Sequence, residues 1–532
     1  MTGKTDHENV EAESGHDADD EAAGQEPSGR GPPDGMFYRL QKYGYRKFPS
    51  VIPDPDRAAI LRDSRSTDNR DNAETEPPAD ETIDTKCIWA VELYTPSQIS
   101  ELLHRFEKLG WNRDDPTNPD RSPVDWIQSF RESARGGGWF NLGPLYRHGD
   151  RRFFYRGREA PLPEGVDYAV ASMYSLTSSV TCVVIGFLLD DEHGRKFEDA
   201  LRLDRQSIVE PLRGRGYRLP GPSHLKETDI KRIRDNLREM AAGWFRTNLP
   251  GVFSAGALAG EFPTCEFTTL RKTAPCPGRE DRDPQADRWL EILNIDYDLD
   301  AWQAEKLPGL KFVWPLIRDR EKQFYAVLTC REDTVSDETL RTYGGGGRTS
   351  YTTYIDRHVN GLLSRWGLLG LLAGYERHLN TTRDSATFGS AQRAKVLRQL
   401  DRLRGHIAQS VDVAAATTDL KHLSEQKGSF LSEVETFKPC DPKLYRDKDI
   451  TLGEALRADI SERSGWLREM DRSVRDLLIE HGTALSAREN IKAQGRMVVL
   501  TWAIAVLTIV ITVLTAVTTI VSINSGSLSW PW

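Results

Sequence analysis

Residues 166–189 read VDYAVASMYSLTSSVTCVVIGFLL, and this stretch decides the fold of the chain. Two runs rich in β-branched and aromatic residues flank the polar residues 177–179. Such runs on either side of a short polar turn predict two antiparallel strands. The second run is apolar at nearly every position, which is typical of a central strand covered on both faces.

The segments around this hairpin continue a mixed pattern. Residues 87–94 (CIWAVELY) are predicted to form a first strand, and residues 310–317 and 323–330 a hairpin across the charged turn RDREK. Five apolar residues recur at helical spacings of three and four: Ile230, Ile233, Leu237, Met240 and Trp244. Residues 85–332 are therefore predicted to form an α+β domain with a mixed or antiparallel sheet.

Helical patterns replace strand patterns after the glycine run 344–347. Residues 352–430 are predicted to form a helical region. Pro439 and Pro442 interrupt it, because proline ends helices. Residues 452–496 are then predicted to form a stalk helix.

The C-terminal part of the sequence changes character. Residues 497–532 contain no Asp, Glu, Lys or Arg, and 497–523 are almost wholly apolar. About 20 apolar residues suffice to cross a bilayer as a helix, so 497–523 is predicted to be a transmembrane helix in the cell membrane. Arg488, Lys492 and Arg496 precede it. The positive-inside rule then places residues 1–496 in the cytoplasm and the tail 524–532 outside, as in a single-pass, tail-anchored protein.

Small residues follow a heptad along this helix. They are spaced alternately by four and three: Thr501, Ala505, Thr508, Thr512, Thr515, Thr519 and Ser522. Small and hydroxyl-bearing residues on one stripe let membrane helices approach closely, which predicts a homo-oligomer. The alternative is that each threonine hydroxyl binds a carbonyl of its own helix. Met470, Leu477, Ala484, Ile491 and Val498 continue the same phase, as a coiled coil would.

The junction RENIKAQGRMVVLTWAIAVLTIV (488–510) resembles the entry into the first membrane helix of CorA-type divalent-metal transporters. The shared features are Asn490, Gln494 and the Leu500–Thr501 pair, and the resemblance spans roughly residues 460–523. That family has a Gly-Met-Asn motif and a second membrane helix after this point, and residues 524–532 contain neither. The resemblance therefore implies a bundle of such helices.

The N-terminal residues carry most of the net charge of −9. Residues 1–35 hold ten acidic residues against Lys4 and Arg30, so the remainder is near neutral and gives no general case for nucleic-acid binding. The acidic stretch lacks periodicity and an apolar run, so it is predicted to be disordered and not a signal peptide. Residues 1–84 are predicted to be a disordered tail and linker. Within them, the aromatic and basic segment 36–53 could lie on an anionic membrane or dock on the body, and we expect docking because no clean amphipathic period is evident.

One arginine cluster is a candidate anion site. It comprises Arg131, Arg135, Arg147, Arg151, Arg152, Arg156 and Arg158, interleaved with aromatic residues. Arginine forks suit phosphates and aromatic rings stack bases, so the cluster could bind an anionic ligand. The alternative is a pair of strands with arginines facing solvent.

Motifs for catalysis, metals and cofactors are not evident. GVFSAG (251–256) resembles a nucleophile elbow but has one residue too many before Ser254. Asp296, Asp298 and Asp300 alternate as in a calcium loop, but the glycine and glutamate that an EF-hand needs are replaced by Ala301 and Leu307. The six cysteines lack CxxC spacing and are expected to be reduced. We therefore expect no catalytic residue, metal or cofactor.

These features favour a membrane-anchored module. Its α+β domain is expected to act as a sensor, scaffold or partner-binding unit for an unidentified cytoplasmic protein or anionic ligand. Two alternatives are a membrane-tethered enzyme acting on an anionic or phosphorylated ligand, and a transporter or pore-associated subunit. Charged residues do not occur on the predicted membrane helix, which argues against an ion path along one helix.

Overall fold

A computed structural model describes residues 36–48, 55–112, 122–133, 137–150, 157–211, 217–254, 262–278, 280–296, 301–314, 324–343, 347–387, 411–444 and 449–524. The acidic stretch 1–35 and nearly all of the tail 524–532 lie outside these residues. The chain forms two compact units, one of residues 1–67 with 207–219 and one of residues 68–206 with 220–532.

The first unit is small. It contains helices α1 (Met36–Lys47) and α2 (Pro55–Arg65) and a two-stranded antiparallel sheet of β6 (Glu210–Pro211) and β7 (Tyr217–Arg218). The hydroxyls of Tyr45 and Tyr217 lie 2.8 Å apart and join α1 to β7.

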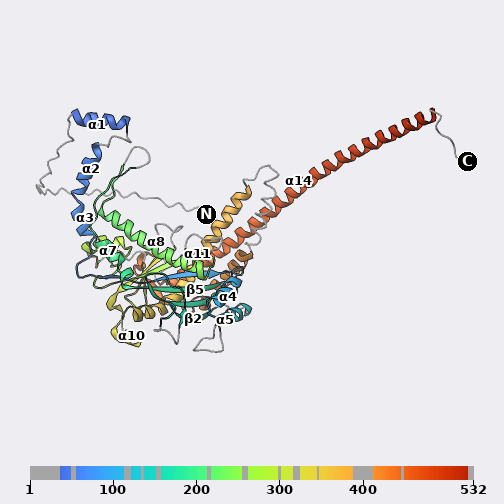
Figure 1. The fold of residues 1–532 in the computed structure, drawn as a ribbon. Coiled ribbons are helices and arrows are strands. Elements are labelled where there is room, and N and C mark those ends of the chain that lie inside the picture. Colours follow the sequence, from blue (N-terminus) through green and yellow to red (C-terminus); the bar gives the residue numbers. More distant parts are fainter. Residues whose placement is uncertain are drawn as a thin grey trace, which may run out of the picture. The chain divides into compact units, whose positions relative to one another are not determined.

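The second unit is built on a ten-stranded mixed sheet in the order β12-β9-β10-β11-β8-β1-β5-β4-β2-β3 (Figure 1). Most neighbours are antiparallel, while β8–β11 and β2–β3 are parallel. The strands are β1 (Ile83–Tyr94), β2 (Gly138–Tyr146), β3 (Arg158–Glu159), β4 (Val166–Ser175), β5 (Thr181–Leu189), β8 (Thr264–Leu270), β9 (Ala301–Ala304), β10 (Lys311–Val313), β11 (Tyr325–Arg331) and β12 (Phe437–Pro439). The predicted α+β class with a mixed sheet is confirmed.

The hairpin predicted from residues 166–189 is confirmed as β4 and β5, and every residue of β5 is buried. The predicted first strand is β1, which pairs with β5 on one side and β8 on the other. The predicted hairpin at 310–330 is confirmed as β10 and β11, although β10 is only three residues long.

Helices cover both faces of the sheet. The shorter ones are α3 (Asp68–Glu74), α4 (Ile99–Lys108), α5 (Pro123–Glu132), α6 (Asp191–Gly194), α7 (Lys196–Arg202), α9 (Pro284–Ile292), α10 (Asp337–Thr342), a helix at 411–425 and α13 (Lys427–Phe430), with 3₁₀ turns at Glu332–Thr334 and Pro442–Leu444. The long ones are α8 (Pro222–Asn248), α11 (Arg348–Thr387) and α14 (Leu452–Asn524).

Side-chain alternation shows which long helix covers which face. Trp89 of β1 donates from Nε1 to Asp356 of α11 at 2.8 Å. Phe187 of β5 pairs with Ile88 and contacts Trp244 of α8, with ring centroids 5.6 Å apart. Successive residues of a strand point to opposite faces, so α11 and α8 lie on opposite faces of the sheet.

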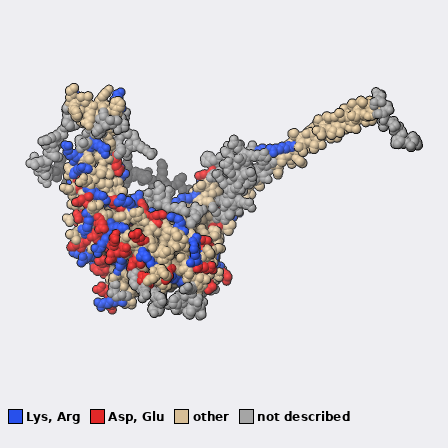
Figure 2. Space-filling model, viewed as in Figure 1, with Lys and Arg blue, Asp and Glu red and all other residues tan. Residues whose placement is uncertain are grey.

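Helix α14 joins this domain to the apolar C-terminal segment without a break over 73 residues. Its first part buries Leu456, Ile460, Ser464, Leu467, Asp471 and Val474. These residues are spaced by three and four, and α14 packs against α11. Residues 490–523 form the single helix in the described part of the chain that is long and apolar enough to cross a membrane, and none of its most apolar window is buried. Figure 2 shows basic residues where this segment begins and none of either sign beyond them.

The division expected between residues 332 and 352 does not coincide with a boundary between compact units, because the sheet, α11 and α14 belong to one unit. Strand β12 lies beyond the predicted helical region and pairs with β9 at the sheet edge. Met470, predicted to lie on an intermolecular heptad seam, packs against the chain's own core.

Candidate functional site

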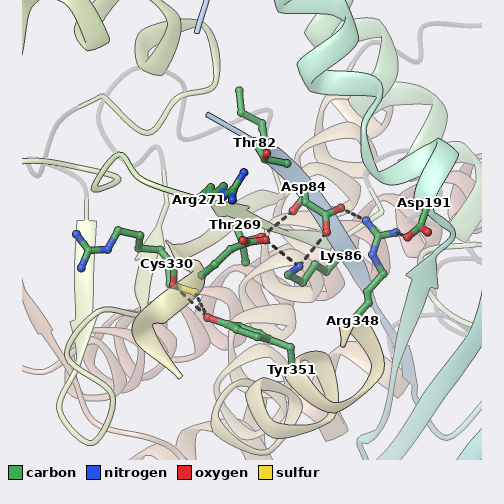
Figure 3. A network of polar contacts seen from close by, with 12 residues as sticks. Thr82, Asp84, Lys86, Asp191, Thr269, Arg271, Cys330, Arg348 and Tyr351 are labelled. Atoms are coloured by element: carbon green, nitrogen blue, oxygen red, sulfur yellow. Dashed lines mark hydrogen bonds and ion pairs between the residues drawn. The ribbon is translucent and has the colours of Figure 1, made fainter. Parts of the chain in front are cut away.

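A cluster of charged side chains, most of them largely buried, lies where α11 begins against the ends of the strands (Figure 3). Lys86 of β1 is central: its Nζ lies 2.8 Å from Asp84 Oδ2 and 3.5 Å from Glu332 Oε1, and its side chain is 8% exposed. Burial lowers the pKa of Lys86, while the nearby Glu332 carboxylate acts in the opposite direction.

Arg348, the first residue of α11, completes the cluster. It forms an ion pair with Asp84 and donates from Nη1 to the carbonyl of Leu189 at 2.6 Å and to that of Asp190. Burial lowers the pKa of Arg348 to about 10. A Cβ at Gly194 would overlap this guanidinium, which is the end of a flexible side chain and would have to shift.

The charged groups of this cluster have a structural role. Its basic and acidic groups pair with one another, so it presents no net positive field for an anion. Tyr351 packs beneath Lys86 and its hydroxyl lies 3.3 Å from Cys330 Sγ. Burial raises the pKa of the Cys330 thiol to about 12, which favours the protonated thiol. We conclude that the cluster fixes the start of α11 to the sheet.

The turn after α8 is organised by a buried carboxylate. Glu92 of β1 accepts backbone N–H bonds from Phe253 at 2.8 Å, Ser254 at 2.9 Å and Leu93 at 3.0 Å. Burial raises the pKa of Glu92 to about 7, although these bonds favour the ionised form. A Cβ at Gly251 would lie 2.6 Å from Glu92 Cγ, so the turn needs glycine there.

Among the described residues, Ser254 has a structural role in the turn after α8. Its hydroxyl accepts from the Gly251 N–H at 3.0 Å, and the residue is buried. It lines a pocket of about 310 Å³ with Asp235, Arg238, Glu239, Ala242, Arg246, Phe253 and Phe262. No histidine is among these described lining residues. Their charged side chains form two ion pairs, Arg246–Glu239 at 3.1 Å and Arg238–Asp235 at 3.8 Å.

The arginine cluster is described only in part. Arg135, Arg151, Arg152 and Arg156 lie outside the described residues. Arg158 donates to the carbonyls of Trp111 at 2.6 Å and Leu142 at 3.0 Å, and Arg147 donates to that of Pro163 at 2.5 Å. Arg131 is half-buried, and burial lowers its pKa while Asp412 and Asp419 oppose that shift. Arg147 and Arg158 therefore hold loops in place, and anion binding by the cluster stays a prediction.

The described residues were also compared with the requirements of a metal site and of a reactive thiol. Among those residues no group of three His, Cys, Asp or Glu side chains could hold a metal ion. Asp298 and Asp300 lie outside them. All six cysteines are free, and five are buried. Burial raises the thiol pKa of Cys87, Cys182, Cys265 and Cys330, as expected for reduced core residues.

The small-residue seam keeps its spacing on α14. Five of its threonines donate to the carbonyl four residues earlier at 2.7–2.8 Å: Thr501, Thr508, Thr512, Thr515 and Thr519. Their hydrogens are therefore used within the helix, whereas their lone pairs and small size stay available to a neighbour. Ala505 is exposed and Ser522 is partly exposed. Self-association along the seam stays a prediction.

Sequence reasoning missed a buried arginine that connects α11 to the approach to α14. Arg365 donates to the carbonyls of Phe430 at 3.2 Å and Ser432 at 3.0 Å. A Cβ at Gly361, one turn earlier, would lie 1.8 Å from the Glu433 carbonyl oxygen, so this segment sits directly on the helix. The available signal was one arginine beside the apolar run 366–375.

Comparison with known proteins identifies no relative of this chain. No family model matches the chain, and no curated protein matches it.

Proposed function

We propose that this chain is a non-enzymatic membrane module. Its α+β domain binds a cytoplasmic partner or ligand and passes the resulting change to a membrane helix, through which copies associate. The observation that carries the proposal is the continuity of α14, which packs in the domain at one end and is uncharged and apolar at the other.

The energetics favour insertion of this segment. Residues 497–523 contain fifteen Leu, Ile and Val residues and no charged residue. Each such residue contributes roughly −0.3 to −0.6 kcal/mol at the centre of a membrane helix, which gives about 5–9 kcal/mol in favour of insertion. Lys492 and Arg496 precede the segment and favour a cytoplasmic domain.

The route from domain to membrane is a series of packed contacts. α11 packs on β1 and β5, and α14 packs on α11. Asp471, buried on α14, receives a hydrogen bond from Arg475 at 2.8 Å. Burial raises the pKa of Asp471, while Arg475 and, less strongly, His378 of α11 oppose that shift. Because packed helices shift as units, a displacement of α11 on the sheet would displace the membrane helix with it.

Membrane extraction and a topology reporter test the anchor. We expect the full chain to stay in the membrane pellet after alkaline washing and a reporter fused after Trp532 to be active only outside. Deleting residues 497–523 should release the protein into the soluble fraction. Soluble full-length protein, or a reporter active only in the cytoplasm, would contradict the anchor or its orientation respectively.

A further inference from the structure

Helix α1 carries its apolar side outward. Four of its large apolar or aromatic side chains are highly exposed: Met36 at 81%, Phe37 at 83%, Leu40 at 59% and Tyr43 at 63%. Phe48, just after the helix, is 63% exposed. Exposed apolar surface gathered on one element marks an interaction site.

The geometry of the helix explains this exposure. Met36, Leu40 and Tyr43 are spaced by four and three, which places them on one face. Tyr38 and Tyr45 lie on the opposite face and are partly buried, and Tyr45 meets Tyr217 of β7. A surface helix of a soluble protein normally turns its apolar face inward. α1 does the reverse, so the expectation that segment 36–53 lacks an amphipathic period is wrong for the part that the structure describes.

The charge of α1 identifies the surface that it fits. Its twelve residues include no acidic residue and four basic ones, Arg39, Lys42, Arg46 and Lys47. Arg39 and Lys42 are three residues apart, which places both along one flank of the apolar face. A basic flank beside exposed aromatic and apolar residues is the pattern of helices that lie in the plane of an anionic membrane.

We propose that α1 lies on the anionic lipid surface of the membrane, with Met36, Phe37, Leu40 and Tyr43 at the boundary between headgroups and acyl chains. A lipid surface fits better than a protein partner because the spanning helix of the same chain keeps α1 near the bilayer, at high effective concentration. This second argument rests on the proposed anchor, whereas the charge and exposure of α1 do not.

A depth measurement on the full chain in lipid nanodiscs tests the proposal. Two variants, Leu40→Cys and Gln41→Cys, carry an environment-sensitive fluorophore, and the parent chain treated identically corrects for labelling of native cysteines. The discs contain acyl-brominated phosphatidylcholine alone or with phosphatidylglycerol. Gln41 is the matched control because it follows Leu40 on α1 but is turned about 100° away and is half-buried.

We expect the label at position 40 to be quenched about threefold more in anionic than in neutral discs, and to recover in high salt. The label at position 41 should be quenched much less. Replacing Arg39 and Lys42 with Gln should remove the dependence on phosphatidylglycerol. Two results would overturn the proposal directly: no quenching of the label at position 40, or equal quenching in neutral and anionic discs. A label that is shielded from water but not quenched by the lipid, and more so at higher protein concentration, would also overturn it and would indicate contact with a second copy.

Failure of the anchor gives a different result. If the chain does not remain in the discs, vesicle flotation with the same lipids tests α1 alone. Flotation with anionic vesicles that is lost in the Phe37→Ser, Leu40→Ser variant supports the proposal without the anchor. Flotation that this variant leaves unchanged overturns it.

Discussion

Replacing Arg365 with Met should loosen the segment that leads into α14. Arg365 is 3% exposed and makes two hydrogen bonds to the carbonyls of Phe430 and Ser432. Bonds from a charged donor contribute about 1.5–3 kcal/mol each, so the pair contributes about 3–6 kcal/mol. Burial lowers the pKa of Arg365, so burying its charge is costly, and methionine avoids that cost. We expect a net loss of about 2–4 kcal/mol in local stability.

Hydrogen exchange of the full chain in detergent measures this loss. Each 1.4 kcal/mol changes an equilibrium tenfold, so amides of residues 427–434 should exchange about 30- to 700-fold faster. Arg357→Met, on an exposed position of the same helix, is the control and should change exchange by less than about fivefold. Unchanged exchange at 427–434, or an equal rise in both variants, would show that Arg365 does not hold this segment.

Three further predictions concern the seam, the turn after α8 and the arginine cluster. Replacing the four threonines Thr508, Thr512, Thr515 and Thr519 with leucine should lower cross-linking of copies in membranes about tenfold or more. The control variant, with leucine at Ile504, Ile511 and Val517, should change cross-linking little. Equal cross-linking in the two variants would refute the seam. Because the folded-state pKa of Glu92 is raised from 4.5 to about 7, the folded chain binds more protons than the unfolded chain in that window, and this residue's contribution to stability falls as pH rises through it. Thermal unfolding should therefore depend less on pH between 4.5 and 7 in Glu92→Gln, and an unchanged dependence would show that Glu92 does not titrate there. If the arginine cluster binds phosphates, the full chain should bind a polyanion with an affinity that falls steeply as salt concentration rises. Replacing Arg151, Arg152 and Arg156 with alanine should weaken this binding and make it depend less on salt. A variant whose salt dependence equals that of the parent would refute phosphate contacts by these residues.

The predictable parts of the fold are those with strong local periodicity. Residues 166–189 form the expected hairpin because both strands carry long apolar runs around a short polar turn. α8 and α14 likewise follow their apolar spacings. These segments repeat one pattern over many residues, so no distant contact is needed to fix them.

The unpredicted parts depend on distant contacts. Strand β12 has three residues and exists because it pairs with β9, more than a hundred residues earlier. Pro439, which suggested a break, is tolerated at this edge of the sheet, where a missing N–H need not cost a ladder bond. The clusters around Lys86 and Arg365 combine residues far apart in sequence, and single charged residues carry no pattern that foretells them.

The two roles of α14 place a limit on where copies can associate. Asp471 and Val474 are buried on α14, and Met470, the neighbouring seam residue, packs against the hydrophobic core of the domain. A side chain on a helix points in one direction, so Met470 cannot contact a second copy while it packs against its own domain. If copies associate as proposed, their contact would begin further along α14 and rest mainly on the threonines within 501–522. Met470 could contact a second copy only if it left the core of its own domain, so packing of the domain and association of copies would compete for that side of α14.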